Sequence, residues 1–175
     1  MAQGSPLQNL CHPEKSGLLY RLHAGYGFRL GGGNAENDGI LAQMDIAYRS
    51  TPLFGDFSLE AGSSMDFFGE TEHLAAYLQL NYHANDRWIF SLRGFGGGVK
   101  DKREPTTNVA VNTAEKDGDD LGGIVQAWLG GSYRLDDKFD LGAAVGLDWE
   151  LYGKSGGDQG TQLGLVQYLN LAYHL

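Results

Sequence analysis

The chain has 175 residues, a length that suits one domain with a sizeable buried surface. Its formal net charge of -9 argues against nucleic acid as a partner, because phosphate binding needs a basic surface. The single cysteine, Cys11, excludes an internal disulfide framework. The 27 glycines and 4 prolines favour strands and tight turns, and no apolar run approaches the roughly 20 residues of a membrane-spanning helix.

Residues 17–30 alternate between two kinds of side chain. Apolar residues from Leu18 to Leu30 occupy every second position, and the positions between them include Arg21 and His23. Successive side chains of a strand point to opposite faces, so the pattern predicts a strand with one apolar and one polar side. The same pattern recurs in seven further segments: 39–49, 56–68, 73–83, 87–98, 122–135, 138–152 and 162–175. We therefore predict an all-β, eight-stranded antiparallel up-and-down barrel, which closes without an unpaired edge.

The predicted connections differ at the two ends of this barrel. The first, third, fifth and seventh strands are followed by "GGGNAEND", "GETE", the long stretch 99–121 and "GKSGGDQGT", whereas "STPLFG", "HAND" and "LDD" follow the even strands. Long connections at one end and short turns at the other are typical of an outer-membrane barrel with external loops and periplasmic turns. This predicts a bacterial outer-membrane location with both termini in the periplasm, residues 1–15 as an extended tail and 16–175 as the barrel.

Alternation alone leaves open which face is outside, because a soluble barrel of the lipocalin type has the same period with its apolar face inward. The aromatic residues of the apolar face gather at the short-turn end of every strand, whereas mid-strand positions are mostly aliphatic or small. Rings at one level form a girdle at a membrane–water interface, and a soluble core has no reason to sort them to one rim. The predicted girdle comprises Tyr20, Tyr48, Phe57, Tyr82, Trp88, Tyr133, Phe139 and Tyr173.

The polar face combines small residues, such as Gly25 and Gly142, with all the charged residues of the strands. Its charges nearly balance, as a buried network requires, because an unpaired buried charge is very costly. A Lys or Arg facing lipid at mid-bilayer would cost roughly 2–4 kcal/mol, so we place this face inside. The predicted interior network, structural or gating, comprises Arg21, Asp45, Glu60, Arg93, Arg134, Asp140 and Asp148, and the same face carries Arg29, Arg49, Asp66 and Glu150.

With this strand count, girdle and loop asymmetry, the chain resembles the small eight-stranded bacterial outer-membrane barrels, the class of outer-membrane proteins A and X and the Ail-type adhesins. The terminal segment "VQYLNLAYHL", with Leu171, Tyr173 and Leu175 on the lipid face, is similar to the signal read by the barrel-assembly machinery, although Leu175 replaces the usual final phenylalanine. The resemblance implies a structural or adhesive anchor in the lipid bilayer, with external loops, chiefly 99–121, contacting a partner that the sequence does not identify. It matches no family-specific motif, so no functional residue is carried over.

The sequence leaves other interpretations of the barrel open. The cluster of Arg21, Asp45, Glu60 and Arg93 either plugs the interior with ion pairs or gates a narrow ion path, and we favour the plug. Because a soluble barrel has the same alternation, a carrier of a hydrophobic ligand stays an alternative, and so does an engineered barrel.

An outer-leaflet lipid-modifying enzyme needs serine and histidine within hydrogen-bond reach, oriented by a third group. Only His73, beside Glu70 and Glu72 and near Ser63 and Ser64, is predicted at the external rim. We therefore expect no enzyme and no catalytic residue.

Calcium is the metal that the acidic stretch "EKDGDD" suggests, because Asp117, Asp119 and Asp120 supply the oxygen ligands that it prefers. Their spacing does not match an EF-hand loop, and a solvated acidic loop is the better interpretation. We expect neither a metal nor a cofactor.

Overall fold

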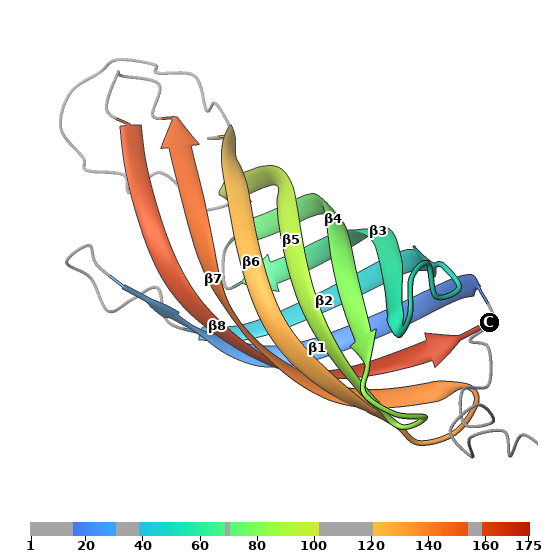
Figure 1. Ribbon diagram of the computed structural model, residues 1–175. Helices are drawn as coiled ribbons and strands as arrows, with labels where there is room; N and C mark the ends of the chain where they lie inside the picture. The colour runs from blue at the N-terminus through green and yellow to red at the C-terminus, as the bar shows by residue number, and fades with distance from the viewer. Residues whose placement is uncertain (1–15, 31–38, 69–70, 102–120, 154–158) are drawn as a thin grey trace, which may run out of the picture.

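The computed structural model describes residues 16–30, 39–68, 71–101, 121–153 and 159–175. Its strands form one closed antiparallel sheet in which each strand pairs with the next and the last with the first. Figure 1 shows them wound around a common axis. The strands are β1 (Gly17–Arg29), β2 (Gly39–Arg49), β3 (Phe57–Phe68), β4 (Thr71–His83), β5 (Trp88–Asp101), β6 (Leu121–Arg134), β7 (Phe139–Gly153) and β8 (Gln159–His174). The described residues include no helix long and apolar enough to cross a membrane.

The predicted eight-stranded barrel is confirmed, but several strand ends were placed wrongly. β4 begins at Thr71 rather than 73, β5 extends to Asp101 rather than 98, and β8 begins at Gln159 rather than 162. The predicted connection 99–121 is therefore shorter than expected, because residues 99–101 and 121 belong to strands. Backbone pairing such as Gly153 with Gln159 continues the ladder without any apolar alternation, so the sequence pattern stops before the strand does.

The apolar face of the sheet points outward. Leu129 on β6 and Leu169 on β8 are 63% and 67% exposed, whereas the charged side chains of Asp45 and Glu60 are fully buried inside. This is the reverse of a soluble carrier, in which the apolar face lines the interior. The apolar side chains of the predicted alternation therefore face outward, and the charged side chains lie in the lumen.

The height of the outward apolar band fits a lipid bilayer. On β7 it runs from Phe139 to Trp149, about 33 Å along the strand at the usual rise of about 3.3 Å per residue. A strand tilt of about 40° reduces this length to about 25 Å, the height of the apolar band of transmembrane barrels. The fold is therefore that of a transmembrane barrel.

Four aromatic rings cross the lumen in a continuous series, here called the aromatic layer, which was not predicted from the sequence. It consists of Tyr77, Phe95, Trp128 and Tyr168, with neighbouring ring centroids 5.7, 4.5 and 4.4 Å apart. All four residues are buried. An interior of eight strands holds such rings only where the facing positions are small, and Gly146 lies directly against the Trp128 ring.

We predict that Gly146→Ala destabilises the barrel by about 1–3 kcal/mol, because its Cβ would overlap the Trp128 ring and the Ala127 carbonyl oxygen. The free energy of unfolding in detergent measures this. Gly96→Ala is the matched control, since a Cβ there meets nothing within 4 Å, and should be neutral or stabilise by up to about 1 kcal/mol. Equal effects of the two substitutions would show that the lumen is not tightly packed.

Candidate functional site

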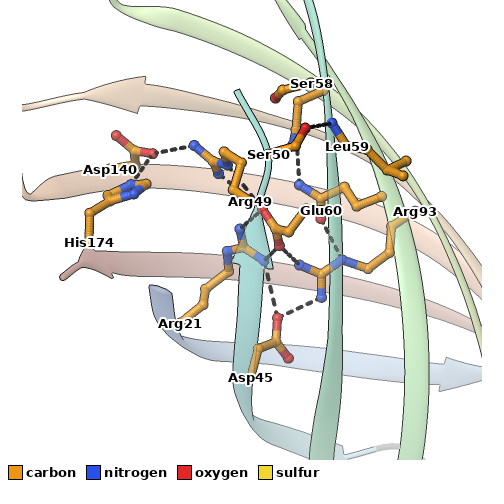
Figure 2. A network of polar contacts seen from close by, with 12 residues as sticks. Arg21, Asp45, Arg49, Ser50, Ser58, Leu59, Glu60, Arg93, Asp140 and His174 are labelled. Carbon is orange, nitrogen blue, oxygen red and sulfur yellow. Dashed lines mark hydrogen bonds and ion pairs between the residues drawn. The ribbon is translucent and has the colours of Figure 1, made fainter. Parts of the chain in front are cut away.

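The Glu60 carboxylate on β3 is the centre of the interior charge network, and its side chain is fully buried. It accepts hydrogen bonds from Arg21 of β1 at 2.9 and 3.1 Å and from Arg49 of β2 at 3.2 and 3.1 Å. The Tyr77 hydroxyl on β4 donates a further bond at 2.8 Å. Figure 2 shows the arginines converging on this carboxylate. These charge-assisted bonds offset the cost of burying the negative charge.

Asp45 on β2 is a second buried acceptor in the network. Arg93 of β5 donates to it at 2.6 Å and Arg21 at 3.2 Å, so Arg21 joins the two carboxylates. The Gln43 amide donates at 2.7 Å, and His23 Nε2 lies 2.9 Å away, in position to donate as well. Arg93 reaches Asp45 from across the lumen, because β5 and β2 are not neighbours in the sheet.

Arg93 connects this network to the aromatic layer. Its guanidinium lies 3.9 Å from the centroid of the Tyr77 ring and 5.2 Å from that of Trp128. Its Nε donates to Gln79 at 2.6 Å. The Arg93 guanidinium therefore makes ion pairs and cation–π contacts at the same time.

Asp140 on β7 gathers a second group of charges close to the short-turn end, which we define by the connections 50–56, 84–87 and 135–138. His174 Nε2 lies 2.8 Å from its carboxylate, and Arg134 Nε and Arg49 Nη1 lie 3.5 Å from it. Arg49 therefore links the Asp140 group to Glu60 (Figure 2). The charged side chains form one network that reaches from β7 and β8 to β5.

The structure brings together six of the seven residues predicted for the network: Arg21, Asp45, Glu60, Arg93, Arg134 and Asp140. Asp148 is buried farther along β7, beside Gly164 of β8. The predicted set omitted Arg49, although its interior position followed from the alternation, and it also omitted the polar partners. Tyr77 and Gln79 share the inward phase of β4, and that phase was the signal that could have identified them.

The eight aromatic residues predicted for the girdle lie at the short-turn end on the outward face. Three cross-strand pairs are in ring contact with centroids 5.0 to 5.1 Å apart: Phe57–Tyr82 and Phe139–Tyr173 are tilted, and Trp88–Tyr133 is T-shaped. Tyr20 lies opposite Tyr173 in the β1–β8 register. Tyr48 is exposed on β2. At the other end, Phe28 and Trp149 are exposed on the same face.

The serine and histidine residues near the opposite end do not have the geometry of an activated nucleophile. His73 is buried inside the barrel with Nδ1 3.7 Å from Asp66, and the Ser64 hydroxyl donates to the same carboxylate at 3.4 Å. The acid thus lies between serine and histidine, whereas activation requires the histidine in the middle. Ser63 points outward. Glu70 lies outside the described residues.

A shorter contact joins Ser58 and His83 at the short-turn end, with Oγ and Nε2 2.8 Å apart. Ser58 is fully buried, and it does not line the cavity of about 310 Å³ beside His83 at the barrel mouth. A substrate in that cavity would not reach the hydroxyl.

Metal ligands are not grouped in the described ranges, where no cluster of three or more His, Cys, Asp or Glu side chains could hold an ion. The acidic residues Asp117, Asp119 and Asp120 lie outside these ranges, so the structure does not test that hypothesis.

Comparison with solved structures identifies the architecture. The crystal structure of neisserial surface protein A matches with a TM-score of 0.62 at 11% identity, covering 91% of this chain and 98% of that one. The chain has the fold of a small outer-membrane barrel. The N-terminal barrel domain of OprF from Pseudomonas aeruginosa matches with a TM-score of 0.48 at 13% identity, covering 92% and 100% of the two chains. Ail, the attachment invasion locus protein of Yersinia pestis, matches with a TM-score of 0.49 at 10% identity, covering 91% and 97%.

No protein-family model and no curated protein matches the sequence. The match to neisserial surface protein A and the closed sheet confirm the resemblance to the small eight-stranded barrels for the fold, and an identity of 11% carries no functional residue across.

We predict that Glu60→Ala lowers the free energy of unfolding by about 3–5 kcal/mol, because it leaves Arg21 and Arg49 buried without their main acceptor. Urea unfolding of the refolded protein measures the change. Asp56→Ala removes the same charge from the exposed β2–β3 connection and should change stability by less than about 0.5 kcal/mol. If both variants unfold alike, the network does not stabilise the barrel.

Proposed function

We propose that this protein is a bacterial outer-membrane barrel that serves as an anchor and presents its long connections for adhesion or interaction outside the cell, chiefly residues 102–120 of the predicted connection 99–121. One observation carries the proposal: the outward face is apolar, while the lumen is filled by ion pairs and aromatic rings. Because its outside is apolar and its lumen is filled, such a barrel can bind a partner only at its ends. The partner of the external connections is to be sought by experiment.

The packing of the lumen favours an anchor over a pore. Next to the charge network lies a cavity of about 20 Å³, room for about one water molecule. The aromatic layer spans four strands, β4, β5, β6 and β8. A continuous water path would require both the rings and the ion pairs to move aside.

The orientation that we propose places the short-turn end in the periplasm. In outer-membrane barrels the short turns are periplasmic and the long connections extracellular. The aromatic girdle at the short-turn end, with Arg87 donating to the Tyr133 hydroxyl at 2.6 Å, has the amphipathic character of a membrane interface. The outward Leu171 and Tyr173 of β8 fit delivery by the barrel-assembly machinery.

The membrane location predicts a strong effect of one lipid-facing charge. Leu129→Arg should destabilise the protein by about 2–4 kcal/mol in phospholipid vesicles, because Leu129 lies mid-strand on the outward face. The boiling-dependent shift in gel mobility, followed through a urea titration, reports the folded fraction. Leu135→Arg, in the exposed β6–β7 turn, is the control and should behave like the parent. A stable, detergent-free Leu129→Arg protein would contradict the membrane location.

The orientation predicts opposite labelling of two introduced cysteines in a Cys11→Ser background. A membrane-impermeant maleimide should label Thr113→Cys on intact cells. Asp137→Cys, in the β6–β7 turn, should react only after the outer membrane is permeabilised. The reverse pattern would place the termini outside the cell.

The plugged lumen predicts no stable single-channel steps from the purified protein in planar bilayers. Reproducible steps that change in Glu60→Ala, but not in Asp56→Ala, would instead assign the network to a gated ion path. Such a result would overturn the plug while leaving the membrane location intact.

A further inference from the structure

The β2–β3 connection, residues 50–56, is more apolar than the other two connections at the short-turn end. It carries one charged residue, Asp56, whereas the connections 84–87 and 135–138 carry two and three. Two of its apolar side chains, Leu53 and Phe54, are 59% and 61% exposed. An exposed apolar pair beside an aromatic girdle is suited to contact with lipid.

Backbone hydrogen bonds fold this connection back onto the start of β3. The Leu53 amide donates to the Phe57 carbonyl oxygen at 2.8 Å, and the Phe57 amide donates to the Phe54 carbonyl oxygen at 3.1 Å. Gly55 has a φ of 54°, which glycine adopts without the steric cost of a Cβ. The chain therefore reverses at Gly55, and backbone groups that are paired within the turn can lie at a membrane interface at little cost.

The reversal places the Phe54 ring on the girdle. It stacks on the ring of Phe57, with centroids 5.3 Å apart and an angle of 25° between the ring planes. Phe57 in turn contacts Tyr82 of β4 at 5.1 Å. Because Phe57 and Tyr82 belong to the outward girdle, Phe54 extends that girdle beyond the end of the sheet.

The two sides of the turn face different surroundings. Pro52, Gly55 and Asp56 line the cavity of about 310 Å³ at the barrel mouth, whereas Leu53 and Phe54 do not. Leu135 of the β6–β7 connection is 54% exposed and does line this cavity. Similar exposure thus describes two situations: Leu135 faces the mouth, and Phe54 lies on the outer surface.

We propose that Leu53 and Phe54 insert into the boundary between headgroups and acyl chains of the leaflet at the short-turn end. Phospholipid is the partner, because the Phe54 ring continues a girdle that already faces lipid. This contact requires the transmembrane location of the proposed anchor. It carries the lipid contact of the β2–β3 flank past the sheet, whereas at the other two connections the exposed residues line the mouth.

The test places a fluorescent ring at the site. Phe54→Trp is made together with Trp88→Phe and Trp149→Phe, which leaves Trp128 in the lumen as a background signal to subtract. The protein is reconstituted in phosphatidylcholine vesicles brominated on the acyl chain close to the headgroup. We expect bromination to quench the added fluorescence by at least about twofold, because the ring lies among the acyl chains.

Absence of this quenching would overturn the proposal, and iodide on both sides of the membrane identifies the alternative. Quenching by iodide alone would place the ring in water. Shielding from both quenchers would show that protein, such as a second copy of the chain, covers it.

Two controls accompany this variant. Leu135→Trp in the same background is matched in exposure but faces the mouth, so iodide and not the brominated lipid should quench it. Equal quenching of the two variants by brominated lipid would contradict a contact confined to the β2–β3 connection.

The second control keeps Trp88 of the girdle and replaces only Trp149. Brominated lipid should quench it, and failure would overturn the transmembrane location together with the lipid contact of Phe54. Quenching of Trp88 without quenching of the Phe54→Trp variant would overturn the lipid contact alone.

Discussion

The hydrogen bonds that Arg21, Arg49 and Tyr77 donate to the Glu60 carboxylate tie together the first four strands of the barrel. Eight strands enclose a space filled by side chains, so a charge inside has no bulk water to solvate it. Each carboxylate must instead be surrounded by donors from neighbouring and opposite strands. The positions of Arg93 and Asp140 follow from this requirement, and the closed sheet makes it geometrically possible.

Around Glu60 the lumen is stabilised by side chains of complementary charge. In the rest of the lumen it is stabilised by side chains of complementary size. The aromatic layer is accommodated because Gly146 and Gly25 let the Trp128 and Tyr168 rings lie against the backbone of the neighbouring strand. The small residues that the sequence places on the inward face are thus the counterparts of large ones. The small residues also leave the cavity of about 20 Å³ beside Arg49, which no side chain fills.

The alternation between Leu18 and Leu30, repeated seven times, was sufficient to predict the strands and the barrel, because each strand has one face in each of two environments. The aromatic girdle and the confinement of charged residues to one face were needed to predict that the apolar face is outside. The alternation was insufficient for pairings across the lumen, such as Arg93 with Asp45, which depend on stagger and tilt. The aromatic layer was missed for a related reason: aromatic residues were assigned to the outward face, although Trp128 is in phase with the inward Gln126. Strand ends such as Asp101 were misplaced because backbone pairing outlasts the apolar pattern.

The network also constrains the order of events during assembly. A β2–β3 hairpin entering a bilayer alone would pair Glu60 with Arg49 of the same hairpin, but it would carry Asp45 without Arg93, whose strand follows much later in the chain. Asp140 likewise takes one partner, Arg49, from β2 and another, His174, from the last strand. Strand-by-strand insertion would leave Asp45 and Asp140 without these partners until the later strands arrive. The long-range pairs of the network therefore favour insertion and closure of the sheet as one concerted step.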